Sequence, residues 1–242
     1  MSASELKERI ASVQGRIETA ARRVGRDPAG IALVAVSKTQ PPEAVVAACY
    51  AGLRLFGENR VEEAGPKAQA VAGLLAPGVG PIWHMIGHVQ SRKAIEVLPW
   101  AAMVHSVDSV RLAERLSRFS LQAGTELAIL LEVNVSGEAG KYGLAPQELP
   151  RAVEAIAPLP GLRLEGLMTM APIAEDPESV RPVFARLHAL KDDMARRYPA
   201  VSWRHLSMGM SDDFEVAIEE GATLVRIGRA IFGERPEVEF VC

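Results

Sequence analysis

The chain has 242 residues, of which 48% are hydrophobic and 24% charged, and its formal net charge is −3. The slightly negative charge gives no electrostatic reason to expect nucleic acid or an anionic membrane as a partner, and no apolar run approaches the roughly 20 residues that a membrane span needs. The two cysteines, Cys49 and Cys242, have no spacing typical of disulfide frameworks or zinc sites, so we expect a reducing, cytoplasmic location.

The N-terminal segment is basic enough to suggest a targeting peptide, but acidic residues interrupt it, and transit peptides are poor in acids. Ser2 and Glu5 have the spacing of a capping box at a helix start. The apolar residues that follow fall on one helical stripe, formed by Leu6, Ile10, Val13, Ile17 and Val24. We therefore predict a structural helix here.

Beyond this helix, short apolar runs alternate with amphipathic segments. The runs predict eight strands, at Ile31–Ser37, Leu55–Asn59, Ile82–Gly87, Met103–Asp108, Leu127–Val135, Leu162–Met170, His205–Met210 and Leu224–Gly228. The segments between them predict helices at Pro42–Ala51, Val61–Leu75, Ser91–Leu98, Ser109–Ala123, Pro146–Ala157, Glu178–Tyr198 and Asp212–Gly221. The strands are nearly continuous Val, Ile and Leu runs, as in a parallel sheet covered by helices.

Eight such units without a long linker predict an α/β fold, a single (β/α)8 TIM-type barrel with an extra N-terminal helix, spanning 1–242 as one domain. An open, doubly wound sheet is the competing fold. It is disfavoured because no glycine-rich turn with dinucleotide-binding spacing follows the first strand. The glycine- and proline-rich segment 73–81 is predicted to be a loop within the domain.

Polar residues mark the ends of the predicted strands. In barrels of this type the active site lies at the carboxyl ends of the strands, where side chains from all eight units meet. The residues at these ends include Lys38, Asn59, His84, Asp108, Asn134, Thr169, Ser207 and Arg226. We therefore predict one polar pocket at this end of the barrel.

Lys38 directly follows the apolar run Ile31–Val36, so its stem leaves a dry strand and its amine reaches the predicted pocket. Burial there disfavours the ammonium form, which is what a lysine that forms a Schiff base needs. The alternative is a lysine that extends its amine into solvent at the end of a strand. Position alone does not decide between the two.

The last two units are the expected place for a phosphate, which in such barrels commonly lies between the loops after strands seven and eight. Ser207, Ser211 and the backbone amides of Gly228 and Arg229 are the candidate ligands, and Gly209 lets the backbone approach an anion. The alternative for Ser211 is an ordinary helix N-cap.

Arg226 interrupts an apolar strand, and a buried guanidinium must be paired. It has two possible roles, a structural salt bridge to Glu132 or Glu165, or a contact with a ring nitrogen of a ligand. His84 and His88 are four residues apart but not on a helix, so we expect no metal site.

Several segments taken together resemble the pyridoxal phosphate homeostasis protein family, whose fold is similar to the N-terminal barrel of alanine racemase. They are Ala35–Thr39, Phe56–Asn59, Trp83–Gly87, Gly166–Met168, Ser207–Asp213 and Val225–Gly233, in this order. The likeness covers almost the whole chain. Two departures concern the rim of the pocket, Arg60, where the family often has an aromatic residue, and the segment His88–Lys93.

The resemblance implies a pyridoxal 5'-phosphate cofactor attached to Lys38 as a Schiff base. It implies that Ser207, Ser211 and the amides of Gly228 and Arg229 hold the phosphate. It also implies that Arg226 faces the pyridine nitrogen and that Asn59 and His84 form pocket walls.

An arginine opposite the pyridine nitrogen keeps its own proton, so the ring stays neutral and is a weak electron sink, which fits transamination poorly. A racemase needs an acid/base group on each face of the substrate, and beside Lys38 only Tyr142 is a plausible second group. In alanine racemase the opposing tyrosine comes from a second domain. This chain ends soon after the last strand, so we expect that domain to be absent.

We therefore predict a monomeric binder, without catalytic residues, that stores pyridoxal phosphate or delivers it to apo-enzymes. The alternative is a weak pyridoxal phosphate-dependent amino-acid racemase, for which amino acids would be further ligands. A barrel aldolase that uses Lys38 on a sugar phosphate is a third possibility.

Overall fold

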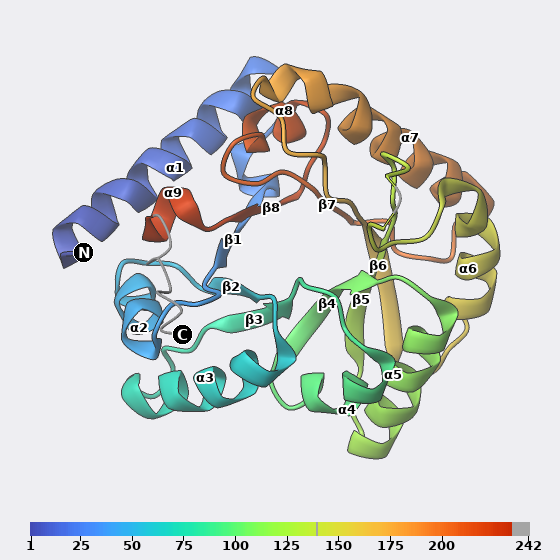
Figure 1. The fold of residues 1–242 in the computed structure, drawn as a ribbon, viewed down its shortest axis with the longest axis horizontal. Coiled ribbons are helices and arrows are strands. Elements are labelled where there is room, and N and C mark those ends of the chain that lie inside the picture. The colour runs from blue at the N-terminus through green and yellow to red at the C-terminus, as the bar shows by residue number, and fades with distance from the viewer. Residues whose placement is uncertain (139, 234–242) are drawn as a thin grey trace, which may run out of the picture.

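The computed structural model describes residues 1–138 and 140–233, so Cys242 lies outside the described residues. Eight parallel strands close into a barrel in the order β1 to β8 (Figure 1). The strands are β1 (Ala32–Val36), β2 (Leu55–Glu58), β3 (Ile82–Met85), β4 (Ala101–Val107), β5 (Leu127–Glu132), β6 (Leu162–Met168), β7 (His205–Ser207) and β8 (Leu224–Ile227). This confirms the predicted (β/α)8 fold, whereas one domain over 1–242 stays a prediction.

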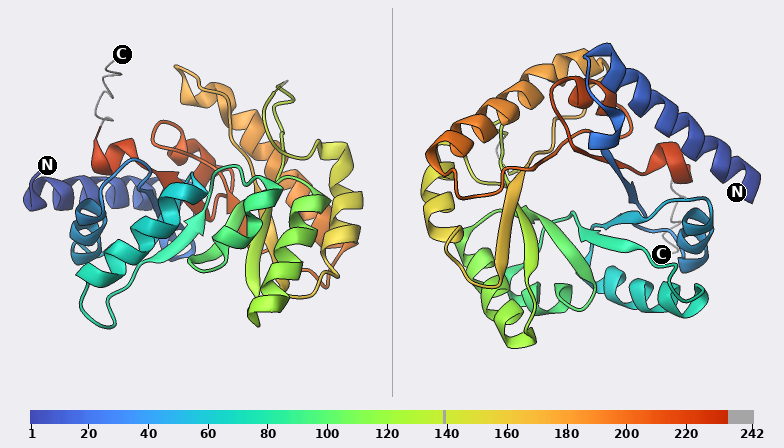
Figure 2. Two further views of the ribbon diagram at one scale, coloured as in Figure 1. Left: turned by 60° about the horizontal axis from the view of Figure 1, so that its bottom comes forward. Right: turned by 180° about the vertical axis from the view of Figure 1, so that it is seen from behind.

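Helices surround the strands on the outside of the barrel, as the view from behind shows (Figure 2). They are α1 (Ala3–Arg23), α2 (Pro42–Tyr50), α3 (Val61–Leu74), α4 (Ala94–Val97), α5 (Val110–Ala123), α6 (Leu149–Ile156), α7 (Arg181–Arg197), α8 (Phe214–Glu219) and α9 (Arg229–Phe232). Within the described ranges, no helix combines the length and the apolar character needed to cross a bilayer.

The N-terminal helix α1 packs against α8 and α9 (Figure 1). Its start is capped as predicted, because the Ser2 hydroxyl accepts a hydrogen bond from the Glu5 amide at 3.1 Å. The Glu5 carboxylate does not complete the capping box but binds Arg9 at 2.8 Å. The predicted stripe is buried except for Val24, which follows the last helical residue and is 43% exposed.

Successive strand residues face opposite sides of the sheet, which divides the apolar residues into two cores. The larger core lies between strands and helices. The smaller core fills the barrel and contains Val34, Val36, Ile86, Met103, Ala128, Leu130, Met168 and Leu224. Residues His84, His105, Ser207 and Arg226 are also buried and form a polar layer.

The barrel is closed by pairing between the first and the last strand. Ala32 pairs with Leu224, and Ala35 pairs with Ile227, so four consecutive residues of β1 and β8 are in register. The loops that follow β1 and β8 are therefore neighbours at the carboxyl end of the barrel.

Candidate functional site

A cavity of about 850 Å³ opens at the carboxyl ends of the strands. Its lining comes from segments that follow β1, β2, β3, β5, β6 and β7, and from β8 with the segment after it. Six of the eight residues predicted for the site line it, namely Lys38, Asn59, Ser211, Arg226, Gly228 and Arg229. The structure thus brings most of the candidate residues around one cavity, and their role as a binding site stays a prediction.

Arg226 lies at the junction of this cavity and the barrel interior, and only 4% of it is exposed. One guanidinium nitrogen, Nη1, donates to Ser207 Oγ at 2.6 Å, and Nη2 donates to the Thr169 carbonyl at 2.9 Å. Burial lowers the arginine pKa to about 10, so the side chain keeps its charge at neutral pH.

The predicted salt bridge of Arg226 to Glu132 or Glu165 is wrong for the part of the chain that the structure describes. Glu165 binds Arg163 at 2.5 Å instead. Glu132 affects Arg226 only through its charge. The other role, a contact with a ring nitrogen of a ligand, stays a prediction, and Arg226 does line the cavity.

Ser207 and His84 do not line the cavity but support Arg226 from within the barrel. Ser207 Oγ lies 2.8 Å from His105 Nδ1, and His105 Nε2 lies 2.8 Å from His84 Nδ1. Burial lowers the pKa of His84 to about 4 and that of His105 well below its ordinary value, so both rings are neutral. Since Arg226 can only donate, a serine proton directed to His105 gives each of these three hydrogen bonds one donor and one acceptor.

Ser207 and His84 therefore lie beneath the cavity and not in its lining, and the contacts with a cofactor that the resemblance implied for them stay predictions. The Ser207 hydroxyl is fully buried and bound by Arg226 and His105, so a phosphate has no access to it without displacing them. His84 is a pocket wall only indirectly, through His105. The sequence carried no sign of His105, because its inward direction depends on the strand register.

The loop after β7 is shaped by Gly209, whose φ is 92°. A Cβ at this position would lie 2.6 Å from the Ala217 Cβ, so only glycine fits. The Asp213 carboxylate accepts the Met210 amide at 2.6 Å and closes the turn before α8. The alternative reading of Ser211 as an N-cap is therefore wrong, because Asp213 holds that position.

Two acidic side chains near the site, Asp212 and Glu132, have different electrostatic surroundings. Asp212, which would repel an anion, forms an ion pair with Arg229 at the start of α9. Glu132 is buried near Asp108, and burial together with that neighbouring charge raises its pKa to about 7. It is thus partly protonated at neutral pH.

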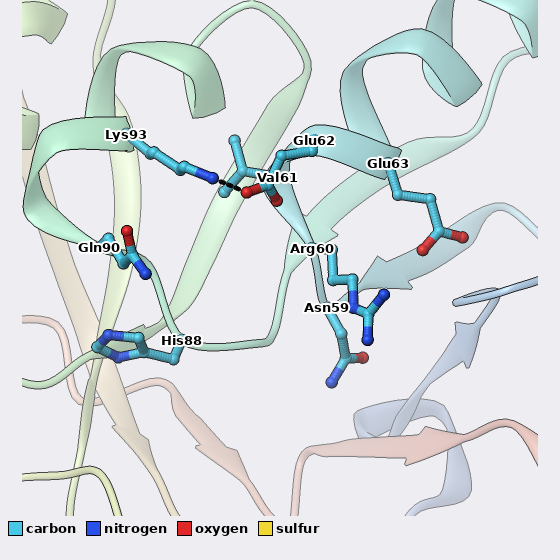
Figure 3. Close-up of a pocket in the computed structure, with 8 residues that line it drawn as sticks. All are labelled: Asn59, Arg60, Val61, Glu62, Glu63, His88, Gln90 and Lys93. Carbon is cyan, nitrogen blue, oxygen red and sulfur yellow. Dashed lines mark ion pairs between the residues drawn. The ribbon is translucent and has the colours of Figure 1, made fainter. Parts of the chain in front are cut away.

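A second cavity, of about 670 Å³, lies beside the first and shares Asn59 with it (Figure 3). It is lined by Arg60 and by residues of the segment His88–Lys93, the two places where the sequence departs from the pattern of the family it resembles. Lys93 forms an ion pair with Glu62 across it (Figure 3). His88 stacks on Tyr142 with ring centroids 3.8 Å apart, and Tyr142 does not line the main cavity.

Comparisons with known proteins agree with this geometry. Residues 10–236 match the family model "Alanine racemase, N-terminal domain". A pyridoxal phosphate homeostasis protein of Pseudomonas aeruginosa is 46% identical over 233 residues, 96% of each chain.

Two solved structures are similar over nearly the whole chain. A Bifidobacterium adolescentis protein of unknown function has a TM-score of 0.87 at 37% identity, covering 95% of both chains. PipY of Synechococcus elongatus, solved with pyridoxal phosphate bound, has a TM-score of 0.81 at 33% identity, covering 94% of this chain and 100% of PipY. The chain belongs to the pyridoxal phosphate homeostasis protein family.

Proposed function

We propose that this protein holds pyridoxal 5'-phosphate as a Schiff base on Lys38 and stores or delivers it within the cell. The observation that carries the proposal is that the amine of Lys38 and the guanidinium groups of Arg226 and Arg229 line one cavity. The cofactor has an aldehyde that condenses with an amine and a phosphate that cations and amides bind.

The cavity fits such a guest in size and in polar groups. Its volume of about 850 Å³ lies within the usual range for small-molecule sites, roughly 300–1,000 Å³. Among the described residues, the amide oxygen of Asn59 is buried without a hydrogen-bond partner. A buried polar atom of this kind costs stability unless a ligand or water satisfies it.

Each lining residue then has a role that follows from its chemistry. The Lys38 amine forms a C=N bond with the aldehyde carbon, and the aldehyde oxygen leaves as water. Ser211, Arg229 and the amides of Gly228 and Arg229 bind the phosphate. Arg226 would face the pyridine nitrogen, and its hydrogen bond to Ser207, supported by His105 and His84, would hold it in place.

The site favours a carrier over a racemase. When bound, the cofactor supplies an electron sink, whose strength depends on protonation of its ring nitrogen. Arg226 is charged and already donates to Ser207 and Thr169, so it has no means of accepting the proton that a strong sink requires. Tyr142, the expected second acid/base group, stacks on His88 instead. We therefore assign no catalytic residue.

We further propose that the protein acts as a cytoplasmic monomer and passes the cofactor to apo-enzymes. Mixing the loaded protein with single enantiomers of amino acids in deuterated water tests the carrier assignment. We expect no sustained exchange of the α-proton, and sustained exchange would show that the protein is an enzyme.

The attachment site is tested by adding pyridoxal phosphate, reducing with borohydride and mapping the modified peptide by mass spectrometry. We expect the adduct on Lys38 in the wild type and no adduct on the corresponding peptide of Lys38→Ala. Lys141→Ala is the matched control, because Lys141 lines the same cavity and should leave the Lys38 adduct intact. An adduct on another lysine of the wild type would refute the proposal.

A further inference from the structure

The segment that carries Lys38, residues 37–39 and here called the lysine loop, has an unusual backbone. Thr39 has a φ of 64°, and among the described residues it is the one non-glycine residue with a positive φ. A side chain with a branched Cβ is strained in this conformation, which persists only where surrounding contacts enforce it. Contacts around the lysine loop must therefore hold Thr39 in this backbone conformation.

Three charged side chains from β2 and α3 hold the lysine loop on both sides of Lys38. The Lys67 ammonium donates to the Ser37 carbonyl at 2.8 Å, and the Glu58 carboxylate accepts the Ser37 hydroxyl at 2.7 Å. On the other side, Glu63 Oε1 accepts the Thr39 amide at 2.7 Å. The residues before and after Lys38 are thus both fixed by side chains that Lys67 connects.

Lys67 is the centre of this group. Its Nζ lies 2.8 Å from Glu58 Oε1 and 2.8 Å from Glu63 Oε1, in addition to the Ser37 carbonyl. These three acceptors match the three hydrogens of an ammonium group, so Lys67 has no free electron pair to compete with Lys38 for an aldehyde. Only 6% of Lys67 is exposed and Glu58 is fully buried.

Stability alone does not account for burying these charges. Removing an ion pair from water costs free energy that well-packed apolar side chains avoid, so buried pairs are weak evidence for a stabilising role. The second carboxylate oxygen of Glu58 is buried without a hydrogen-bond partner, and burial raises the pKa of this group. What the group does accomplish is to fix the backbone on either side of Lys38.

We propose that Lys67, together with Glu58 and Glu63, positions the Lys38 amine for attachment to the cofactor. Lys67 is a positioning residue in this proposal, since it acts through the backbone of the lysine loop and does not touch the ligand cavity that Lys38 lines. The inference rests on the proposed function, because it presupposes that Lys38 carries the cofactor.

The test measures the rate at which added pyridoxal phosphate attaches to Lys38, followed by absorbance and confirmed by borohydride reduction and peptide mapping. The first variant is Lys67→Met, which keeps an unbranched side chain one atom shorter than lysine and removes all three donors. The second is Glu63→Ala, which removes the acceptor for the Thr39 amide but leaves the buried Lys67–Glu58 pair intact. Lys93→Met is the matched control, because Lys93 also binds a glutamate in the first turn of α3 but not the lysine loop.

We expect both test variants to attach the cofactor at least about tenfold more slowly than the wild type, because a misplaced reacting group loses rate steeply. The Glu63→Ala apo-protein should melt at nearly the wild-type temperature, and Lys93→Met should match the wild type in rate. If Lys67→Met does not fold, Glu63→Ala alone decides the question.

Wild-type attachment rates in Glu63→Ala, with the adduct on Lys38, would overturn the positioning role and leave the proposed function standing. A tenfold loss confined to Lys93→Met would overturn it as well. A wild-type protein that forms no adduct on Lys38 would instead overturn the proposed function, and this inference with it.

Discussion

Two buried groups in the barrel are expected to give the apo-protein opposing responses to pH. Burial and the nearby charge of His205 lower the pKa of His84 to about 4 from an ordinary value of 6.5. Burial and the charge of Asp108 raise the pKa of Glu132 to about 7 from 4.5. We predict that substituting either group alone makes the free energy of unfolding depend on pH in the direction set by the remaining group.

The sign follows from which state takes up the proton first. As the pH falls from 7 to 5, the unfolded chain protonates His84 and the folded protein does not, so this group destabilises the fold by about 2 kcal/mol. Over the same interval the folded protein protonates Glu132 and the unfolded chain does not, so this group stabilises the fold by about 2 kcal/mol. In the wild type the two contributions nearly cancel.

The measurement is urea unfolding of the apo-protein at pH 5 and pH 7, followed by circular dichroism. Relative to the wild type, His84→Gln should gain about 2 kcal/mol of unfolding free energy on going from pH 7 to pH 5, and Glu132→Gln should lose about 2 kcal/mol. Each change is taken between two pH values of the same variant, so any pH-independent cost of a lost contact cancels. The reasoning is refuted if both variants follow the pH dependence of the wild type.

Three further substitutions test the contacts that shape the site and the barrel. Arg226→Ala removes two buried hydrogen bonds of a charged group and leaves a void, so we expect the apo-protein to lose about 3 kcal/mol in urea unfolding and to bind the cofactor more weakly. An apo-protein of wild-type stability would contradict this. Gly209→Ala places a Cβ against Ala217 at a φ of 92°, and should cost about 2 kcal/mol in the same assay. Ser2→Ala removes the cap of α1 and should cost about 1 kcal/mol, with faster hydrogen exchange in its first turn as the specific sign.

The order of strands and helices could be predicted from the sequence, because parallel strands that are buried on both faces have nearly continuous apolar runs. The ends of these runs were less accurate. The predicted strand His205–Met210 stops at Ser207, since Gly209 and Asp213 impose a turn that apolar patterning does not register. The predicted helix Asp212–Gly221 begins later for the same reason, at Phe214.

For the site, the position of a residue at a strand end was enough to bring most candidates into one cavity, because the barrel gathers these ends. The sequence did not show which strand side chains point into the barrel. His105 lies in an apolar run with nothing to distinguish it, yet it connects Ser207 to His84. Lys67 has the spacing of an ordinary helical lysine, and only the packing of α3 against the lysine loop shows that it is buried.

The pairing of β1 with β8 has a consequence for how the protein is made. Lys38 follows β1, whereas Arg226 lies in β8 and Gly228 and Arg229 come directly after it, so in a nascent chain the amine emerges long before the residues proposed to hold the rest of the cofactor. The two halves of the binding site meet only when the barrel closes. If the cofactor binds as proposed, it would link β1 to the segment after β8, and it should then slow the separation of β1 from β8 more than that of any other strand pair.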